Sequence, residues 1–398
     1  MKLWRNLLFI GLVLAAAMQI GIAAADDEVI FRDGFEKKMA DPDFVVIADT
    51  RLGPTTTVAI PLSIAGDVKI DWGGSNAACP TRIQPGSGIS FKCEYEHDGV
   101  YEIRISRGSD SGPWLTSYGN GNIGIGLIRI EHAEKIIAIR SFGELGLAAL
   151  NYPSRDALNL VEFPASIPSS LTDLTGAFAT ARRFNGDISG WDTSNVTSMN
   201  SMFRGATSFD GDLGLWDVSK VTDMSFMFFG ATAFNQDIGN WQTQNVTSMV
   251  GLFLGATQFN QDIGGWNTST TESMALMFRD ATAFNQDLST WETGSVSSMS
   301  RMFLGASAFN SDLSSWDVSS VRAMDQMFQS ASSFNSNLGD WQVNFVLDMR
   351  NMFTNAAAFN QDLSRWCVAV FPEEPPNFAK GADSWTLPRP NWGAPCGD

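Results

Sequence analysis

The stretch FNQDIGNWQTQNVTSMVGLFLGAT, residues 234–257, is followed at residue 259 by FNQDIGGWNTSTTESMALMFRDAT, which repeats it almost residue for residue. The same step of 25 residues connects, without an insertion, eight tryptophans: Trp191, Trp216, Trp241, Trp266, Trp291, Trp316, Trp341 and Trp366. It also connects eight phenylalanines: Phe184, Phe209, Phe234, Phe259, Phe284, Phe309, Phe334 and Phe359. A fixed period of this length is typical of a solenoid, in which each unit forms one coil and buries its apolar face against neighbouring coils.

Within one unit, the apolar residues change from helical spacing to a short extended pattern. In VTSMNSMFRGA, residues 196–206, the residues Val196, Met199, Phe203 and Ala206 lie three or four positions apart, which predicts a short helix. The position near its end holds residues that tolerate a left-handed helix stop: Gly205, Gly230, Gly255, Asp280, Gly305, Ser330 and Asn355. The stretch DISGW, residues 187–191, is long enough for one short strand. We therefore predict an α/β repeat solenoid over residues 171–366, with a short parallel strand and a short helix in each coil.

The regular aromatic and methionine positions predict a stacked core rather than a ligand groove, because each large aromatic side chain buries about 150–250 Å². A polar column follows the repeated phenylalanine: Asn185, Asp210, Asn235, Asn260, Asn285, Asn310, Asn335 and Asn360. Columns of this kind form hydrogen-bonded ladders between stacked turns, so we expect an architectural role for it.

A second polar column, two residues further on, consists mainly of carboxylates: Asp187, Asp212, Asp237, Asp262, Asp287 and Asp312, followed by Asn337 and Asp362. Carboxylates stacked about 4.8 Å apart repel one another by roughly 1 kcal/mol per neighbour at a surface-like dielectric. One interpretation is that each aspartate accepts backbone N–H bonds in its own turn. The alternative is a file of bound cations, for which oxygen ligands favour Ca²⁺; otherwise we expect no cofactor.

The unit FNQDIGNWQTQNVTSMVGLF resembles the repeat of the bacterial BspA-like leucine-rich-repeat surface proteins, F-N-x-D-I-x-x-W-D-T-S-x-V-T-x-M-x-x-M-F. The resemblance covers about residues 170–366. It implies a leucine-rich-repeat-like solenoid on a secreted or cell-surface protein linked with attachment to host or neighbouring cells. The family's aspartate after the tryptophan is present here as Asp192, Asp217 and Asp317. Other residues replace it at Gln242, Asn267, Glu292 and Gln342, which argues against a shared ligand site in that column.

The segments that flank the repeats differ from them in pattern. Residues 1–25 have the basic start, apolar run and small residues of a secretory signal peptide, and we expect residues 26–43 to be a flexible lead. Residues 44–108 alternate as strands and predict a small all-β sandwich. Its stretches IDWGG, residues 70–74, and YEHDGVYEIRI, residues 95–105, resemble PKD-type domains. Residues 109–170 predict irregular entry coils that cap the first repeat, and residues 367–398 predict a C-terminal cap.

Four cysteines fall into two local pairs, Cys79 with Cys93 and Cys367 with Cys396. In a secreted chain disulfides are the expected state, and four cysteines allow three connectivities, of which we favour the local one. A Cys367–Cys396 bond would pin the cap over the last coil. A metal site is disfavoured, since neither pair has a C-x-x-C spacing and His97 and His132 are the only histidines.

The composition excludes several classes of function. The formal net charge of −17 disfavours binding to nucleic acid and to anionic membrane surfaces. After the signal segment, no stretch is apolar and long enough to span a bilayer, and no cysteine follows the expected cleavage site to accept a lipid anchor. His97 has no nucleophile motif beside it, so we do not expect an enzyme.

The remaining interpretation is a secreted, extracellular or cell-surface binding protein whose rigid acidic solenoid presents one face to an extracellular protein or glycan. One variable column supplies apolar candidates for this contact, Phe229, Leu254 and Leu304, although packing under the sandwich or the cap would also explain them. Two alternatives stay open: a structural spacer without a specific ligand, and a cation-dependent envelope or assembly component that uses the aspartate column.

Overall fold

The computed structural model of the chain describes the following residues: 43–52, 55–64, 68–74, 79–83, 90–107, 115–119, 135–142, 147, 149–151 and 159–394. The expected signal segment, residues 1–25, lies outside this set, as do almost all of the expected lead and Cys396. Within the described residues, no helix is long and apolar enough to cross a membrane.

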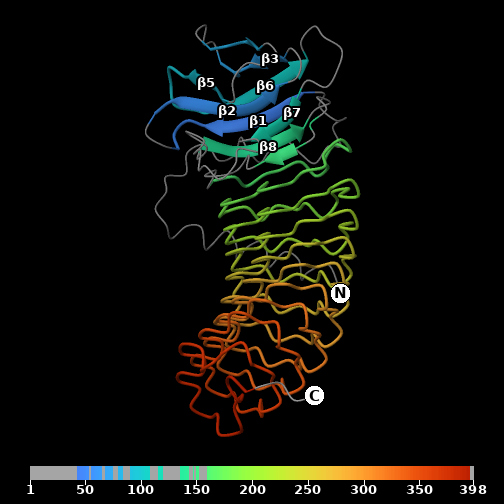
Figure 1. The fold of residues 1–398 in the computed structure, drawn as a ribbon. Helices are drawn as coiled ribbons and strands as arrows, with labels where there is room; N and C mark the ends of the chain where they lie inside the picture. Colours follow the sequence, from blue (N-terminus) through green and yellow to red (C-terminus); the bar gives the residue numbers. More distant parts are fainter. Residues whose placement is uncertain are drawn as a thin grey trace, which may run out of the picture. The chain divides into compact units, whose positions relative to one another are not determined.

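The residues before the repeats form two β-sheets (Figure 1). The strands are β1 (Phe44–Asp49), β2 (Thr57–Ile64), β3 (Val68–Asp71), β4 (Arg82–Ile83), β5 (Ser90–Glu94), β6 (Val100–Arg107), β7 (Leu115–Gly119), β8 (Ile136–Phe142) and β9 (Ala149–Asn151). One sheet has the order β4-β3-β6-β1-β8 and the other β5-β2-β7-β9. All pairings are antiparallel except β7 with β9. Strands β7, β8 and β9 lie in the range for which the sequence predicts irregular coils.

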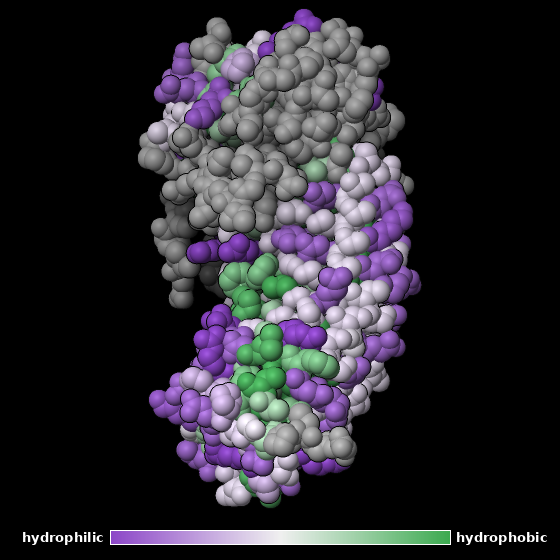
Figure 2. Space-filling model, in the orientation of Figure 1, coloured by the Kyte–Doolittle hydropathy of each residue, from purple (hydrophilic) through white to green (hydrophobic). Residues whose placement is uncertain are grey.

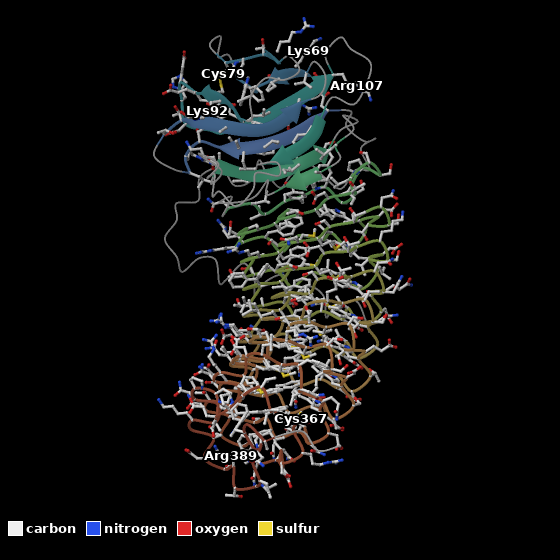
Figure 3. The ribbon with its side chains drawn as sticks, in the orientation of Figure 1. Lys69, Cys79, Lys92, Arg107, Cys367 and Arg389 are labelled. Carbon is white, nitrogen blue, oxygen red and sulfur yellow. A yellow bond between two sulfur atoms is a disulfide. The ribbon has the colours of Figure 1, made fainter. Side chains whose placement is uncertain are left out.

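A small buried cluster holds this region together. Cys79 and Cys93 form a disulfide, and Figure 3 shows Cys79 beside the strands. The indole N–H of Trp72 donates to the Pro80 carbonyl at 2.8 Å, and the Tyr95 hydroxyl donates to the Trp72 carbonyl at 2.7 Å. Burial raises the pKa of Tyr95, so this phenol stays a neutral donor.

The sheets continue into the repeats through backbone pairing. Parallel bridges join Ala138 of β8 to Glu162 and Ala149 of β9 to Asp173. From there one bridge per coil runs along the stack, through Asp173, Ser198, Asp223, Ser248, Ser273, Ser298, Ala323 and Asp348. Figure 1 shows the coils of the repeat region lying one above the other. The backbone of the first coil is therefore paired with strands β8 and β9 instead of being open to water.

The predicted α/β class is wrong, because the described residues contain no α-helix and each coil is built from turns. In residues 249–256, the N–H groups of Met249, Gly251, Phe253 and Gly255 donate to the next coil, and those of Leu252 and Leu254 donate three residues back. A helix would instead bond each N–H to the carbonyl four residues back. The predicted strand at residues 187–191 also contains a turn, and the bridge of that coil lies at Ser198.

The positive φ angles explain the turns. Each coil has two left-handed positions four residues apart, such as Gly251 at 58° and Gly255 at 67°. The left-handed conformation predicted for the Gly255 column is confirmed in all seven coils, although it ends no helix. Helical spacing of apolar residues arises here because Met249, Leu252 and Phe253 all point into the core from successive turns, each with no exposed surface.

The aromatic stripes form the predicted stacked core. Phe253 lies between Phe228 and Phe278, with ring centroids 5.6 Å away on both sides. Each repeated tryptophan from Trp216 to Trp366 donates its indole N–H to a carbonyl 28 residues earlier, at 2.7–3.1 Å. The asparagine ladder is confirmed, since each side-chain oxygen accepts the N–H of the same column in the next coil at 2.7–2.9 Å.

The last coil is covered by residues 367–394, which carry aromatic side chains across its open end. The Trp385 ring meets Phe353 and Phe359 edge to face, at 5.4 and 4.8 Å. The asparagine ladder ends on the same segment, where Asn360 accepts the N–H groups of Thr386 and Leu387. Cys367, labelled in Figure 3, is disulfide-bonded; its expected partner, Cys396, lies outside the described residues.

Candidate functional site

One flank of the repeat region presents partly exposed apolar side chains from four consecutive coils. We call these six residues the apolar band: Phe226, Phe229, Val250, Leu254, Leu276 and Leu304. All six are half-buried, and Figure 2 shows apolar residues gathered in a patch over the repeats. The turns of residues 224–230 and their equivalents hold them, because these turns alternate buried core residues with residues that face outward.

The contacts between coils fix the spacing of the apolar band. The rings of Phe226 and Phe229 lie 6.3 Å apart in one coil. The Gly230 N–H donates to the Leu254 carbonyl at 2.7 Å, which places Leu254 one coil after Phe229. Three steps of about 4.8 Å separate the coils of Phe229 and Leu304, so the band extends about 14 Å along the stack.

One of the two left-handed columns of the stack runs through the apolar band. Phe226 has a φ of 57° and Leu276 a φ of 64°, in a column where Gly251 occupies the intervening coil. A bulky residue in the left-handed region costs of order 1 kcal/mol, so the stack itself gives no reason to prefer Phe or Leu there. The Phe226 ring lies over Gly251, where an added Cβ would come within 2.6 Å of two ring carbons.

Charged residues surround the apolar band. The Arg204 guanidinium lies over the Phe229 ring, 5.1 Å from its centroid, and has no ion pair among the described residues. Arg279 pairs with Asp280 at 3.2 Å. On the far side of the band, Arg301 pairs with Asp325 at 3.5 Å. An exposed cation over an aromatic face is a ready contact for a carboxylate.

The structure brings the three predicted contact residues together on this flank, since Phe229, Leu254 and Leu304 all belong to the apolar band. It adds three residues that the sequence analysis missed, of which Phe226 and Leu276 are the largest. The signal was present: the column that holds Ser201 and Gly251 becomes Phe in the coil of Phe229 and Leu in the coil of Arg279.

The aspartate column is explained by its turns. In Asp187, Asp212, Asp237, Asp262, Asp287 and Asp312, one carboxylate oxygen accepts the N–H of the residue two positions on, at 2.9–3.0 Å. These bonds support the turn interpretation. Within the described part of the chain, no group of three or more histidine, cysteine or acidic side chains is placed to hold a metal ion.

Serine residues strengthen some of these turns. The Ser189 hydroxyl and then its amide lower the pKa of Asp187 from the usual 3.8. The pKa of Asp287 is lowered first by the Ser289 N–H and then by its hydroxyl, and Asp312 is affected in the same way by Ser314. All three carboxyls are therefore ionised in the folded chain at neutral pH.

A pH dependence of stability follows from these lowered pKa values. A carboxyl whose pKa is lower in the folded state stabilises the fold above its unfolded pKa, and this contribution is lost as the pH falls through the folded pKa. We compare the parent chain with an Asp287→Asn, Asp312→Asn variant, which keeps the acceptor oxygen in each turn. The parent should melt at a higher temperature at about pH 5 to 7, and the difference should vanish near about pH 2. An equal difference at both ends of this range would contradict the assignment.

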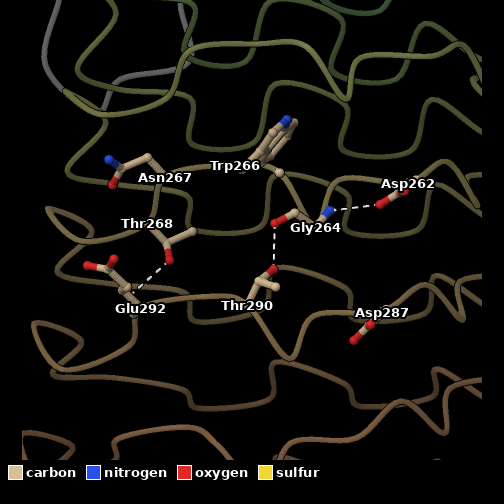
Figure 4. Close-up of a pocket in the computed structure, with 9 residues that line it drawn as sticks. Asp262, Gly264, Trp266, Asn267, Thr268, Asp287, Thr290 and Glu292 are labelled. Atoms are coloured by element: carbon tan, nitrogen blue, oxygen red, sulfur yellow. Dashed lines mark hydrogen bonds between the residues drawn. The ribbon is translucent and has the colours of Figure 1, made fainter.

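A shallow hollow of about 520 Å³ lies beside the aspartate column. It is lined by Asp262, Gly264, Gly265, Trp266, Asn267, Thr268, Asp287, Thr290 and Glu292 (Figure 4). Its hydroxyls already serve the stack: Thr290 donates to the Gly264 carbonyl at 2.7 Å and Thr268 to the Glu292 carbonyl at 2.9 Å. Trp266 is only 3% exposed and offers no stacking surface, so the apolar band is the stronger candidate.

A family model described as "Mycoplasma protein of unknown function, DUF285" matches residues 172–291, 233–317 and 277–382, which together cover more than half of the chain. These segments contain the repeats and the first half of the cap, up to residue 382. No curated protein matches the chain, and no solved structure matches it.

Proposed function

Because the chain belongs to the DUF285 family, whose description assigns no function, we propose from its residues that it is a secreted or cell-surface binding protein that attaches to an extracellular protein or glycan through the apolar band. The observation that carries this proposal is the partial exposure of apolar side chains in four consecutive coils, with two of the bulky ones, Phe226 and Leu276, at left-handed positions. Strained residues persist where they serve a function, and exposed apolar patches mark contact sites.

The extracellular assignment rests on independent features. Residues 1–25 have the pattern of a signal peptide, and the Cys79–Cys93 disulfide is typical of an oxidising compartment. The resemblance of the repeats to BspA-like surface proteins favours attachment between cells as the biological role.

The chemistry of the apolar band favours a protein surface as the partner. Phe226, Phe229 and Leu254 supply contact area, and Arg204 supplies a cation for a carboxylate at the edge. Flat apolar contacts of this kind are typical of protein interfaces, whereas glycan sites depend on exposed aromatic faces and hydroxyl partners. A glycan partner is therefore the second expectation.

An array of immobilised extracellular-matrix proteins and glycans, which also carries the chain itself, tests this proposal. We expect saturable binding by the chain from residue 26, and a loss of at least about 30-fold in affinity for Leu254→Asp, as for a hot-spot residue at an interface. Leu215→Asp is the matched control, because Leu215 is 86% exposed and lies outside the apolar band. Equal binding by both variants would move the site elsewhere, and no binding to any probe would favour a structural spacer.

A further inference from the structure

We propose that the partner of the apolar band is a second copy of this chain, with the coils of the two copies antiparallel about a two-fold axis through the middle of the band. This inference rests on the proposed function and names its partner. It follows from the order of side chains along the flank, which is complementary to itself when reversed.

The flank has a polar coil at each end and four apolar coils between them. The first polar coil contributes Arg204, and the last contributes Asp325 with Gln326 and Gln329. The midpoint of the six coils falls between the coil of Leu254 and the coil of Leu276. A two-fold axis at this point produces an isologous interface, in which each contact occurs twice.

The antiparallel register places the apolar coils of one copy opposite the apolar coils of the other. Leu254 of one copy meets the coil of Leu276 in the other, and Phe229 meets the coil of Leu304. Arg301, in the same coil as Leu304, lies opposite the ring of Phe226, and this repeats the contact that Arg204 makes with Phe229 inside one copy. The stem of Arg279 covers apolar surface near the axis while its guanidinium stays with Asp280.

Charge complementarity between Arg204 and Asp325 favours a second copy of this chain over other protein partners. The antiparallel arrangement brings Arg204 of one copy to the partly exposed carboxylate of Asp325 in the other. Arg204 has no ion pair among the described residues, and Asp325 already pairs with Arg301 of its own copy. Asp325 would then lie between two arginines, once at each end of the interface. Burial of the four apolar coils supplies affinity, and the two end pairs set the register despite the negative charge of each copy.

The mass of the chain in solution provides the first test. Sedimentation or light scattering of the chain from residue 26, at about 1 to 100 µM, is expected to show a concentration-dependent dimer, the range in which interfaces of modest size associate. Leu254→Asp should weaken the dimer at least about 100-fold, because each copy contributes one carboxylate near the axis. Arg204→Glu should weaken it about 10-fold, since it faces Asp325, and this exposed position leaves the core intact. Leu215→Asp should dimerise like the parent.

Cross-linking tests the register. In an Arg204→Lys variant, a zero-length carbodiimide joins the new amine to a carboxylate within contact distance. We expect position 204 linked to Asp325 in the covalent dimer, identified by mass spectrometry of the digest. A link from position 204 to a carboxylate outside the flank, or a dimer that is unaffected by Leu254→Asp, would overturn the proposal.

The two proposals fail in different ways. A chain that stays monomeric throughout but binds another probe in a Leu254-dependent manner would refute the second copy as partner and keep the binding function. A monomeric chain that binds no probe would refute both.

Discussion

Phe253→Ala is expected to lower the free energy of unfolding by about 3–5 kcal/mol, the usual cost of removing a large aromatic side chain from a core. Phe253 has no exposed surface, and its ring lies 3.9 Å from that of Phe259 in the same coil. Because the rings of Phe228 and Phe278 also lose their shared neighbour, the surroundings cannot close around the cavity without breaking the step of the stack. Urea unfolding followed by circular dichroism measures the change.

The control for this substitution is Gln258→Ala, an exposed position five residues further along the same coil. Surface changes of this kind stay within about 0.5 kcal/mol. A loss below about 1 kcal/mol for Phe253→Ala would contradict the view that the ring columns hold the coils together. A repeat stack is coupled only through neighbouring coils, so a second unfolding step in the variant would support that view further.

Trp385→Ala is expected to destabilise the last coils by a similar amount, about 3–5 kcal/mol. Trp385 covers the rings of Phe353 and Phe359, and its indole N–H donates to the Gln361 carbonyl at 2.9 Å. Its removal opens the apolar end of the stack to water, which a solenoid avoids by capping. Hydrogen exchange should therefore become faster in residues 349–366 and stay unchanged in residues 224–241.

Leu387→Ala serves as the control for the cap, because Leu387 is in the same segment but is 43% exposed. We expect little change in its exchange pattern. Uniformly faster exchange along all the coils of Trp385→Ala would show that the end coil is not an independent unit. Exchange at residues 349–366 as slow as in the parent chain would show that Trp385 does not cap the stack.

The sequence predicted which residues lie inside the repeats but not how the backbone curves between them. The period of 25 and the asparagine ladder are properties of side chains at fixed spacing, and both are confirmed. The helix was wrong because Met249, Leu252 and Phe253 have helical spacing, and a run of tight turns buries the same positions. What distinguishes the two is the pair of left-handed positions in each coil. The sequence signals one of them through Gly255 and its equivalents, but Phe226 and Leu276 do not signal the other.

The residues of the candidate site could also be predicted only in part. Phe229, Leu254 and Leu304 stand out in the sequence because their column is otherwise variable. Phe226 and Leu276 were missed because their column contains Ser, Gly, Arg, Gln and Asn in other coils and looks like ordinary surface. Arg204 becomes informative only when its position over the Phe229 ring is known.

The asparagine ladder has a consequence for how genes of this kind change in length. Each coil donates one N–H to the side-chain oxygen of the coil before it and presents its own equivalent oxygen to the coil after it. The last oxygen of the series, on Asn360, accepts the N–H groups of Thr386 and Leu387 in the cap. An in-frame duplication or deletion of 25 codons therefore leaves every bond in the series with a partner, whereas any other insertion breaks the series at one point. Recombination between neighbouring repeats can lengthen or shorten such a protein without redesigning either end.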